Sequence, residues 1–351
     1  MNQTTTGYAA APRGVDMSGE QPPGERLDRA VLDARMAALA EVLDPESIGA
    51  VEGSVTRASD ASGAGSRADS LGDSSARSLV RPAMVKVGVD LGTAYTVVVA
   101  LDEQDRPLAA ASARGQVVRD GVVLDYLGAV ELVRSLKARV EAQLGCALTA
   151  AHGAYPPGVP LSDVRAVQHV IEATGMDCTG LVDEPSAANA VLQLRDGVVV
   201  DVGGGTTGVA VVEDGQVVHT ADEATGGTHL TLVIAGALGV SIEEAEQLKT
   251  DPAQQRSLLP VVRPVMEKVA AIVAAHTRRW PESTLYLVGG SVAFPGFAEV
   301  VSQAIGRPAL VPVHPVYVTP LGIARSAPAA PTQPLLTTPL SSLPARSPRH
   351  G

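Results

Sequence analysis

Cysteine and aromatic residues are scarce in this sequence of 351 residues. The two cysteines, Cys146 and Cys178, lie far apart and in no CxxC pair, which argues against a disulfide or zinc framework and is typical of a reducing compartment. Aromatic residues make up 3% of the chain, so we expect a core of valine, leucine and alanine. The length is sufficient for one large domain or two lobes.

The chain also lacks a basic cluster, a secretory signal and an apolar run of membrane-spanning length. Because the formal net charge is −11, nucleic acid and anionic membranes are not expected as main partners. The N-terminal stretch MNQTTTGYAAAPRGVDMSGE has neither a basic segment nor an apolar core, so no signal peptide is predicted. No stretch is long enough to span a membrane. We therefore expect a cytoplasmic protein.

Composition divides the chain into a folded centre and two extensions. Residues 1–82 form the first extension, in which 45–80 are rich in Ser, Gly, Ala and Asp and are predicted to be disordered. Within it, residues 26–43 carry apolar residues at helical spacing, which predicts an amphipathic helix on a tether. Its apolar stripe consists of Leu27, Val31, Ala34, Ala38 and Val42. Residues 327–351 are rich in Pro and Ser and are predicted to be a disordered tail.

The central residues 83–326 alternate valine-rich strands with helical patterns. The helical patterns lie at 127–145, 162–175 and 259–280. Such alternation is typical of an α/β fold.

Two segments of this centre echo each other. VGVDLGTAYTVVVA (87–100) and VVVDVGGGTTGVAVV (198–212) both have a strand, an aspartate, a small-residue turn and a second strand. Aligning Asp90 with Asp201 also aligns Gly92 with Gly203. A duplicated unit predicts two similar halves that face each other.

The glycine run at 203–208 fits the GxGxxG pattern of dinucleotide-binding proteins, but that pattern requires a helix directly after the glycines. Here VAVVEDGQVVHT follows, which predicts a strand, an Asp-Gly turn and another strand. We therefore reject the dinucleotide interpretation and place the glycines in a β-hairpin.

A hairpin turn without side chains brings its backbone N–H groups close to a phosphate. The aspartate before such a turn repels phosphate, but it can act through Mg²⁺ and its waters, because this ion prefers oxygen ligands. Two such turns, after Asp90 and Asp201, would clamp a polyphosphate with its magnesium ion. The alternative is that each glycine run is only a tight turn.

Six motifs resemble those of the actin-like ATPases, in the form used by DnaK-type chaperones, and they follow that family's order over residues 85–327. They are the phosphate motifs GVDLGTAYT (88–96) and DVGGGTTG (201–208), the connecting motifs LVDEPSAANAVL (181–192) and TPLGIARSA (319–327), the adenine helix EEAEQLKT (243–250) and the adenosine motif LVGGSVAFPGF (287–297). The resemblance implies an α/β actin-like ATPase fold, in which two ribonuclease H-like lobes surround a nucleotide cleft. Lobe I would span about 83–195, lobe II about 196–310, and a closing helix of lobe I about 319–327.

The compact form of the domain resembles the ethanolamine-utilization protein EutJ family. That resemblance implies a chaperone-like protein encoded with a bacterial microcompartment, with ATP or ADP and Mg²⁺ as ligands. Closure of the cleft on nucleotide would assist folding, assembly or reactivation of client or microcompartment proteins, such as ethanolamine ammonia-lyase or shell components. Residues 26–43 would be a docking peptide for the compartment, or would fold back on their own domain.

By this resemblance, Asp90 and Asp201 would orient Mg²⁺ and the attacking water, Glu184 would position that water, and Thr206 would lie near the γ-phosphate. The other predicted nucleotide contacts are Gly92, Thr93, Ala94, Tyr95, Gly203, Gly204, Gly205, Gly227, Glu246, Lys249, Gly289, Gly290 and Ser291.

Most of these residues also have a purely structural interpretation. Glu184 can be a first-turn acid of a helix that starts at Pro185. Glu246 and Lys249 can be an exposed pair at (i, i+3) spacing. Thr206 can be an ordinary strand threonine, and the glycines at 289–290 can be a simple strand-to-helix turn.

The match to DnaK-type proteins has gaps. Gly208 stands where those proteins have an aspartate, and Ala94 replaces a threonine. Of the four lysines, only Lys137 lies in the stretch where the chaperones carry a catalytic lysine, and its surroundings do not match. Because a missing cation removes charge stabilisation at the γ-phosphate, we expect ATP binding and at most a weak ATPase.

Two other functions are compatible with the same fold. One is a cytoskeletal or pilus-assembly scaffold, although the Pro-rich tail lacks the membrane-seeking helix of the division proteins. The other is a small-molecule kinase, although the lobes lack large substrate-binding insertions.

Overall fold

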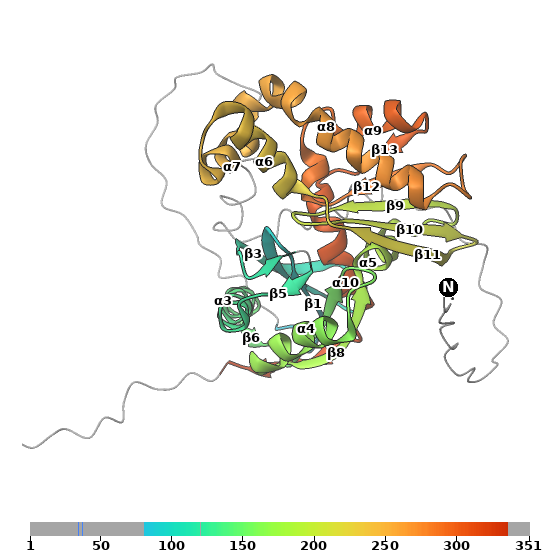
Figure 1. Ribbon diagram of the computed structural model, residues 1–351. Helices are drawn as coiled ribbons and strands as arrows, with labels where there is room; N and C mark the ends of the chain where they lie inside the picture. The colour runs from blue at the N-terminus through green and yellow to red at the C-terminus, as the bar shows by residue number, and fades with distance from the viewer. Residues whose placement is uncertain (1–33, 35–36, 38–80, 120, 336–351) are drawn as a thin grey trace, which may run out of the picture.

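The structure is a computed structural model that describes residues 34, 37, 81–119 and 121–335 (Figure 1). These residues form two lobes, each built on one β-sheet, with helices packed between the sheets. Ala34 and Ala37 are helical and exposed. The rest of the predicted helix at 26–43, and the predicted disordered segments at 45–80 and 336–351, lie outside the described residues.

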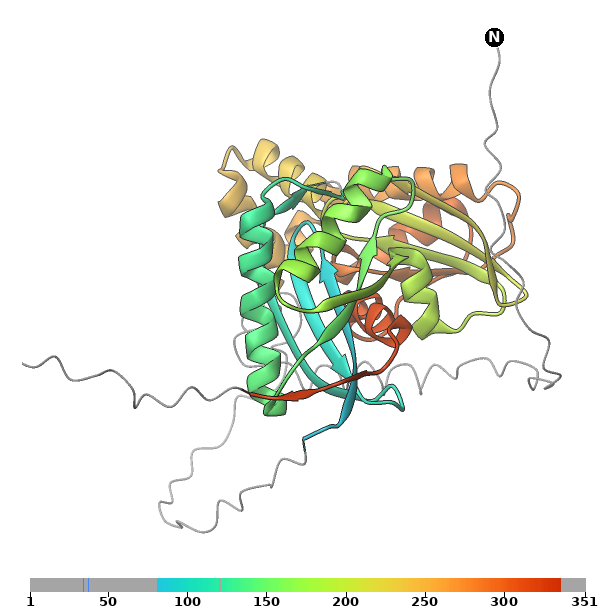
Figure 2. The same cartoon turned by 90° about the horizontal axis from the view of Figure 1, so that it is seen from below.

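Lobe I, the lower lobe in Figure 1, has a sheet with the strand order β3-β2-β1-β7-β8. β1 pairs antiparallel with β2 and parallel with β7. Helices α3 and α4 pack on one face through a core of valine, leucine and alanine, and Figure 2 shows α3 along one side of the lobe. The elements are β1 (Met84–Leu91), β2 (Tyr95–Leu101), β3 (Pro107–Arg114), α3 (Tyr126–Leu144), β7 (Ala150–Tyr155), α4 (Leu161–Ala173) and β8 (Asp177–Asp183).

Lobe II, the upper lobe, has the strand order β11-β10-β9-β12-β13. Helices α6, α8 and α9 pack on its outer face. The elements are β9 (Gly197–Val202), β10 (Thr207–Glu213), β11 (Gln216–Glu223), α6 (Gly227–Leu238), α7 (Ile242–Thr250), α8 (Pro252–His276), β12 (Leu285–Val288), α9 (Phe297–Ile305) and β13 (Ala309–Leu310).

The two sheets are copies of one design, as the sequence echo predicts. In each, three antiparallel strands are followed by two parallel ones. Asp90 in β1 lies opposite Val97, and Asp201 in β9 lies opposite Gly208, which are equivalent positions in the alignment. The turns after the two aspartates also share one backbone hydrogen bond. Gly92 N donates to the Tyr95 carbonyl at 3.1 Å, and its counterpart joins Gly203 N to the Thr206 carbonyl at 3.0 Å.

Side-chain alternation along β9 explains why an apolar strand ends on a carboxylate. Val198, Val200 and Val202 belong to the outer core under the lobe II helices, whereas Val199 belongs to the core between the lobes. Because successive side chains point to opposite faces of a sheet, Asp201 lies on the same face as Val199. The carboxylate therefore faces lobe I.

Two helices, α5 (Glu184–Leu192) and α10 (Val318–Ser326), fill the space between the sheets. They pack very closely, because a Cβ atom on Gly322 would lie 1.8 Å from the carbonyl oxygen of Ala187. Only glycine allows this approach. The pair forms a packed wall between the lobes.

The structure confirms the β-hairpin that is predicted at the glycines. β10 follows the glycines directly, and the turn to β11 places Asp214 and Gly215 at positive φ, as a two-residue hairpin requires. One predicted helix starts earlier than expected. α8 begins at Pro252 rather than near 259, because Asp251 caps it and Pro252 occupies its first position.

The C-terminal boundary also differs from the expectation. Composition predicts a disordered tail from residue 327, whereas the chain continues as β14 (Ala330–Pro331), paired with β1, and β15 (Gln333–Pro334), paired with β6 (Cys146–Ala147). Proline is tolerated in such edge strands because its carbonyl still accepts hydrogen bonds. The Pro331 carbonyl accepts one from Thr149 Oγ1 at 2.6 Å.

Four short elements complete the described fold. They are β4 (Val118–Arg119), β5 (Val122–Val123) and the 3₁₀ helices η1 (Gly290–Ala293) and η2 (Pro315–Tyr317). Among the residues that the structure describes, none of the helices has both the length and the apolarity that crossing a membrane requires.

Candidate functional site

One cavity of about 260 Å³ lies between the lobes, and every residue that the sequence singles out lines it. They are Asp90, Gly92, Thr93, Ala94, Tyr95, Glu184, Asp201, Gly203, Gly204, Gly205, Thr206, Gly227, Glu246, Lys249, Gly289, Gly290 and Ser291. These residues come from both lobes and from positions up to 201 residues apart. The tertiary structure therefore brings the whole predicted set to one place, while the role of each residue stays a prediction.

The two glycine turns meet across this cavity. A Cβ atom on Gly204 would lie 2.8 Å from the Cβ atom of Ala94, so the second turn approaches the first at contact distance. The second turn is also held from behind. The Gly203 carbonyl accepts hydrogen bonds from Gly227 N at 2.9 Å and from Ser291 Oγ at 2.6 Å. Gly227 and the adenosine motif, through Ser291, thus both hold the second turn.

Three carboxyl groups gather beneath the turns. Burial and the nearby Asp201 charge raise the pKa of Asp90 to about 7. Burial raises the pKa of Asp201 to about 6, against a hydrogen bond from Thr319 that lowers it. The pKa of Glu184 is raised well above its ordinary value by burial and by the charges of Asp201 and Asp90. Buried like charges without a cation are unfavourable, so this cluster is suited to hold a positive charge.

The environment of Asp201 is built by residues far away in the chain. Thr319 Oγ1, in α10, donates to Asp201 Oδ2 at 2.5 Å. A Cβ atom on Gly289 would lie 2.4 Å from Asp201 Oδ1, and the φ of Gly289 is +92°. Thr319 was not among the predicted site residues, although it lies in the connecting motif TPLG, because nothing in that motif indicates its partner.

Glu184 fits both of its predicted interpretations. It is the acid in the first turn of helix α5, with Pro185 after it, and Asp183 caps that helix by accepting a hydrogen bond from Ser186 N at 3.0 Å. Glu184 also lies in the wall of the cavity beside the aspartates, so its role with water stays a prediction.

Glu246 and Lys249 form a largely buried pair rather than an exposed one. Lys249 Nζ lies 2.6 Å from Glu246 Oε2, and the side chains are 16% and 22% exposed. Thr231 Oγ1 donates to Glu246 Oε2 at 2.5 Å, and Lys249 Nζ donates to the Gly227 carbonyl at 3.2 Å. Burial lowers the pKa of Lys249, although the Glu246 carboxylate opposes that effect. This network presents polar groups to the lobe II end of the cavity.

A further contact joins the lobes at this end. Arg114, the last residue of β3, donates to the Tyr95 hydroxyl at 2.9 Å and to Glu246 Oε1 at 3.1 Å. Its guanidinium group also lies 5.3 Å from the centre of the Tyr95 ring. Sequence reasoning missed Arg114, because no motif relates it to Glu246, which is 132 residues away.

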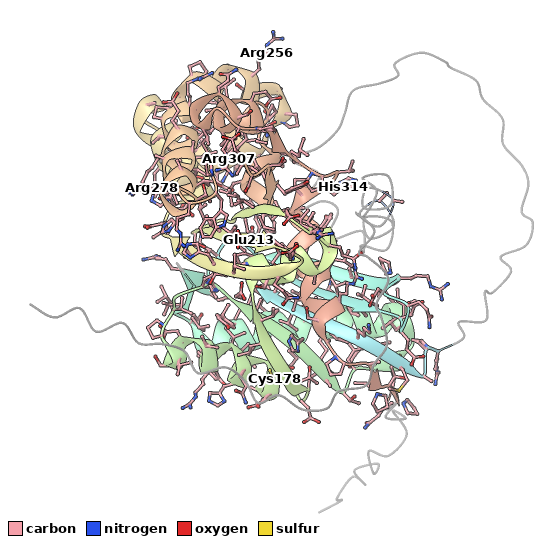
Figure 3. The ribbon with its side chains drawn as sticks, turned by 90° about the vertical axis from the view of Figure 1, so that its right-hand side faces the viewer. Cys178, Glu213, Arg256, Arg278, Arg307 and His314 are labelled. Carbon is pink, nitrogen blue, oxygen red and sulfur yellow. The ribbon has the colours of Figure 1, made fainter. Side chains whose placement is uncertain are left out.

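The four lysines of the chain differ in their position relative to the cavity. Lys86 pairs with Asp105 at 2.7 Å and Lys137 with Glu141 at 2.5 Å. Of the four lysines, only Lys249 lines the cavity, and no arginine of the described residues does. Figure 3 shows Arg256, Arg278 and Arg307 on the upper lobe, with Arg256 pointing away from the body.

The carboxylates alone do not form a metal site. Among the described residues, no group of three or more His, Cys, Asp or Glu side chains could hold a metal ion. The fit of Asp90 and Asp201 to a cation therefore depends on further oxygen ligands, such as waters and phosphate, which is the way that proteins bind Mg²⁺.

Comparison with known proteins identifies the family. The family model of the cell division protein FtsA matches residues 198–324, and that of the MreB/Mbl protein matches residues 114–237. The ethanolamine utilization protein EutJ of Salmonella typhimurium (strain LT2) is 43% identical over 241 residues, which are 68% of this chain and 85% of that protein. The chain belongs to the EutJ family. EutJ of Escherichia coli (strain K12) is 42% identical over 243 residues.

Solved structures agree with this assignment to the EutJ family. A crystal structure of EutJ from Carboxydothermus hydrogenoformans is 48% identical, with a TM-score of 0.66, over 69% of this chain and 89% of that one. A crystal structure of MreB 5 of Spiroplasma citri bound to AMPPNP is 16% identical, with a TM-score of 0.55, over 67% of this chain and 93% of that one. The predicted family and the actin-like ATPase fold are both confirmed.

Proposed function

We propose that this EutJ-family chain binds ATP and ADP with Mg²⁺ in its interlobe cavity and uses closure of the cleft as a conformational signal to partner proteins. The observation that carries this proposal is the meeting of two duplicated glycine turns above a cluster of buried carboxyl groups. The AMPPNP bound by the similarly folded MreB 5 protein adds support.

In this proposal the two turns hold the phosphates. The backbone N–H groups at 92–94 would face them from lobe I, and those at 203–206 from lobe II, because turns without bulky side chains admit close approach. Mg²⁺, when bound, would neutralise phosphate charge and offset the buried carboxylates. Asp90 and Asp201 would hold its water shell, and the hydrogen bond from Thr319 keeps the Asp201 carboxylate oriented.

The nucleoside would occupy the opposite end of the cavity. Glu246 and Lys249 offer an acceptor and a donor there, and Thr231 and the Gly227 carbonyl keep them in place. Gly289 and Gly290 leave room beside them, and the Ser291 hydroxyl is held by the Gly203 carbonyl. The base would thus be positioned by lobe II and the phosphates by both lobes.

Hydrolysis in this proposal is slow. Glu184 would orient water toward the terminal phosphate, and Thr206, which lines the cavity in the second turn, would assist. No lysine or arginine of the described residues lies at that end of the cavity to stabilise the developing charge, a contribution worth orders of magnitude in rate. The conformation of the nucleotide-bound protein, rather than ATP hydrolysis, would then act as the signal to partner proteins.

Other proteins would recognise the closed conformation of the cleft. A nucleotide that contacts both lobes binds the closed state more tightly and shifts the population toward it. The EutJ relatives are named for ethanolamine utilization. The proposed partners that recognise closure are therefore client enzymes or shell components of a microcompartment for that pathway. Residues 26–43 would dock the protein to them.

Calorimetric titration with ATP and ADP, each with and without Mg²⁺, tests the binding proposal. Asp201→Asn removes one buried charge from the cavity and should abolish most of the magnesium-dependent affinity. Asp214→Asn is the matched control, because Asp214 is 83% exposed on the β10–β11 turn and pairs with Arg195. Absence of heat in the unaltered protein, or equal magnesium dependence in the two variants, would refute the proposal.

The partial FtsA and MreB/Mbl matches favour one other function, a polymerising scaffold. Sedimentation at high speed distinguishes the two. A scaffold moves into the pellet when ATP and Mg²⁺ are added, whereas a monomeric or small oligomeric switch stays in the supernatant under the same conditions.

A further inference from the structure

We propose that Arg114 is a gate for nucleotide exchange, because it joins the phosphate turn of lobe I to the nucleoside end of lobe II. This inference rests on the proposed nucleotide binding. The three residues Tyr95, Arg114 and Glu246 are called the Arg114 clasp below. Tyr95 and Glu246 both line the cavity, each from a different lobe, and Arg114 bridges them from outside the lining.

The hydrogen bonds of the clasp allow the single side chain of Arg114 to join the two lobes. A guanidinium group presents donors in a fixed fork, and here one N–H bonds the Tyr95 hydroxyl while another bonds Glu246 Oε1. Glu246 is itself fixed by Lys249 and Thr231 on its other oxygen. Both ends of the bridge are therefore held by their own lobe, so breaking the Arg114 contacts is the step that separates them.

The clasp lies on the solvent side of the cavity. The opposite side is closed by α5 and α10, whose side chains belong to the buried core between the sheets. The phosphate end is closed by contact between the two glycine turns. The Arg114 side chain is 45% exposed, about twice as much as Glu246 at 22%. In this proposal the ligand enters and leaves on the exposed side, where the clasp joins the lobes.

A gate of this kind controls rates and leaves affinity nearly unchanged. The Arg114 contacts must break for the ligand to enter as well as for it to leave, so removing them lowers both barriers. A half-exposed ion pair with one added hydrogen bond corresponds to about a fivefold change in rate.

Association and release of tritiated ADP with Mg²⁺, followed by rapid filtration on the full chain, test the gate. Arg114→Ala should raise both rate constants about fivefold and change Kd by less than about twofold. Arg114→Lys should lie between, because lysine keeps the charge without the fork. The control is Arg106→Ala, which removes an arginine that pairs within lobe I with Asp102. Rates equal to those of Arg106→Ala, or faster release with proportionally weaker binding, would overturn the gate.

A measurement without nucleotide separates failure of the gate from failure of nucleotide binding. Spin labels on Leu127→Cys in α3 and Leu238→Cys in α6, in a Cys178→Ser background, report the distance between the lobes. Leu127 and Leu238 are 72% and 49% exposed, and the remaining Cys146 is buried. Arg114→Ala should lengthen and broaden this distance. An unchanged distance overturns the clasp, whereas a protein that opens but binds no ADP overturns the proposed function.

Discussion

Neutralising Asp201 should stabilise the ligand-free protein, and the structure gives the size of the effect. Burial raises the pKa of Asp201 from 3.8 to about 6. A carboxyl group whose pKa is higher in the folded state binds its proton more tightly there, so ionisation costs stability as pH rises through this window. The cost is about 3 kcal/mol near pH 8 and about half of that near pH 5.

Asp201→Asn should therefore raise the free energy of unfolding by up to about 3 kcal/mol near pH 8, and the gain should shrink as the pH falls. The amide oxygen still accepts the hydrogen bond from Thr319, so little else is lost. Urea unfolding followed by fluorescence of the single tryptophan, Trp280, measures the difference at each pH. Asp214→Asn, on the exposed turn, provides the control for removal of one negative charge.

The same variant should lose the benefit of ligand. A ligand that binds only the folded state raises stability with the logarithm of its concentration relative to Kd, so magnesium and ADP should stabilise the unaltered protein and not Asp201→Asn. A gain that is the same at all pH values, or a variant that is less stable near pH 8, would contradict the assignment of a buried, uncompensated charge to this position.

Three further substitutions test separate parts of the structure. Gly322→Ala should cost more than about 2 kcal/mol in urea unfolding, because its Cβ would lie 1.8 Å from a carbonyl oxygen of α5, whereas Gly236→Ala, with open space around it, should be neutral or stabilising. Thr319→Val removes the hydrogen bond that lowers the pKa of Asp201, so the pH midpoint of magnesium-dependent ADP binding should move upward; a downward or absent shift in calorimetry would count against this role. Lys249→Met should weaken ADP binding about tenfold and leave inorganic tripolyphosphate binding unchanged, if Lys249, which lines the cavity, contacts the nucleoside as proposed. Equal losses for both ligands would place it at the phosphates instead.

Much of the fold could be predicted because its signals are local. The strand, Asp-Gly turn and strand of VAVVEDGQVVHT depend on alternation and on two turn residues, and they appear as β10 and β11. The echo between the two glycine turns can be predicted for the same reason, since each turn is set by a few adjacent residues. The start of α8 at Pro252 was missed because its first turns, QQRS, carry no apolar stripe, although Asp251 and Pro252 supply a cap and a first turn.

The parts of the site that sequence reasoning missed all depend on distant contacts. Thr319 reaches Asp201 over 118 positions, and Arg114 reaches Glu246 over 132. Thr231 and Glu246 belong to different helices, so neither one's spacing indicates the other. Composition predicts a tail where β14 lies, because Ala330 and Pro331 pair with β1 and Thr149, which are distant in the chain. No pattern within a single segment encodes such pairings.

The amino-acid sequence by itself determined where the two glycine turns lie and which carboxylate precedes each. These are properties of short segments, and they are set by side-chain size and by the chemistry of the turn residues. Only the tertiary structure decided that both turns meet in one cavity and that its three carboxyl groups are buried together. Their raised pKa values and the clasp across the lobes exist because residues from both halves exclude water from the same space, and that exclusion depends on the packing of the whole chain.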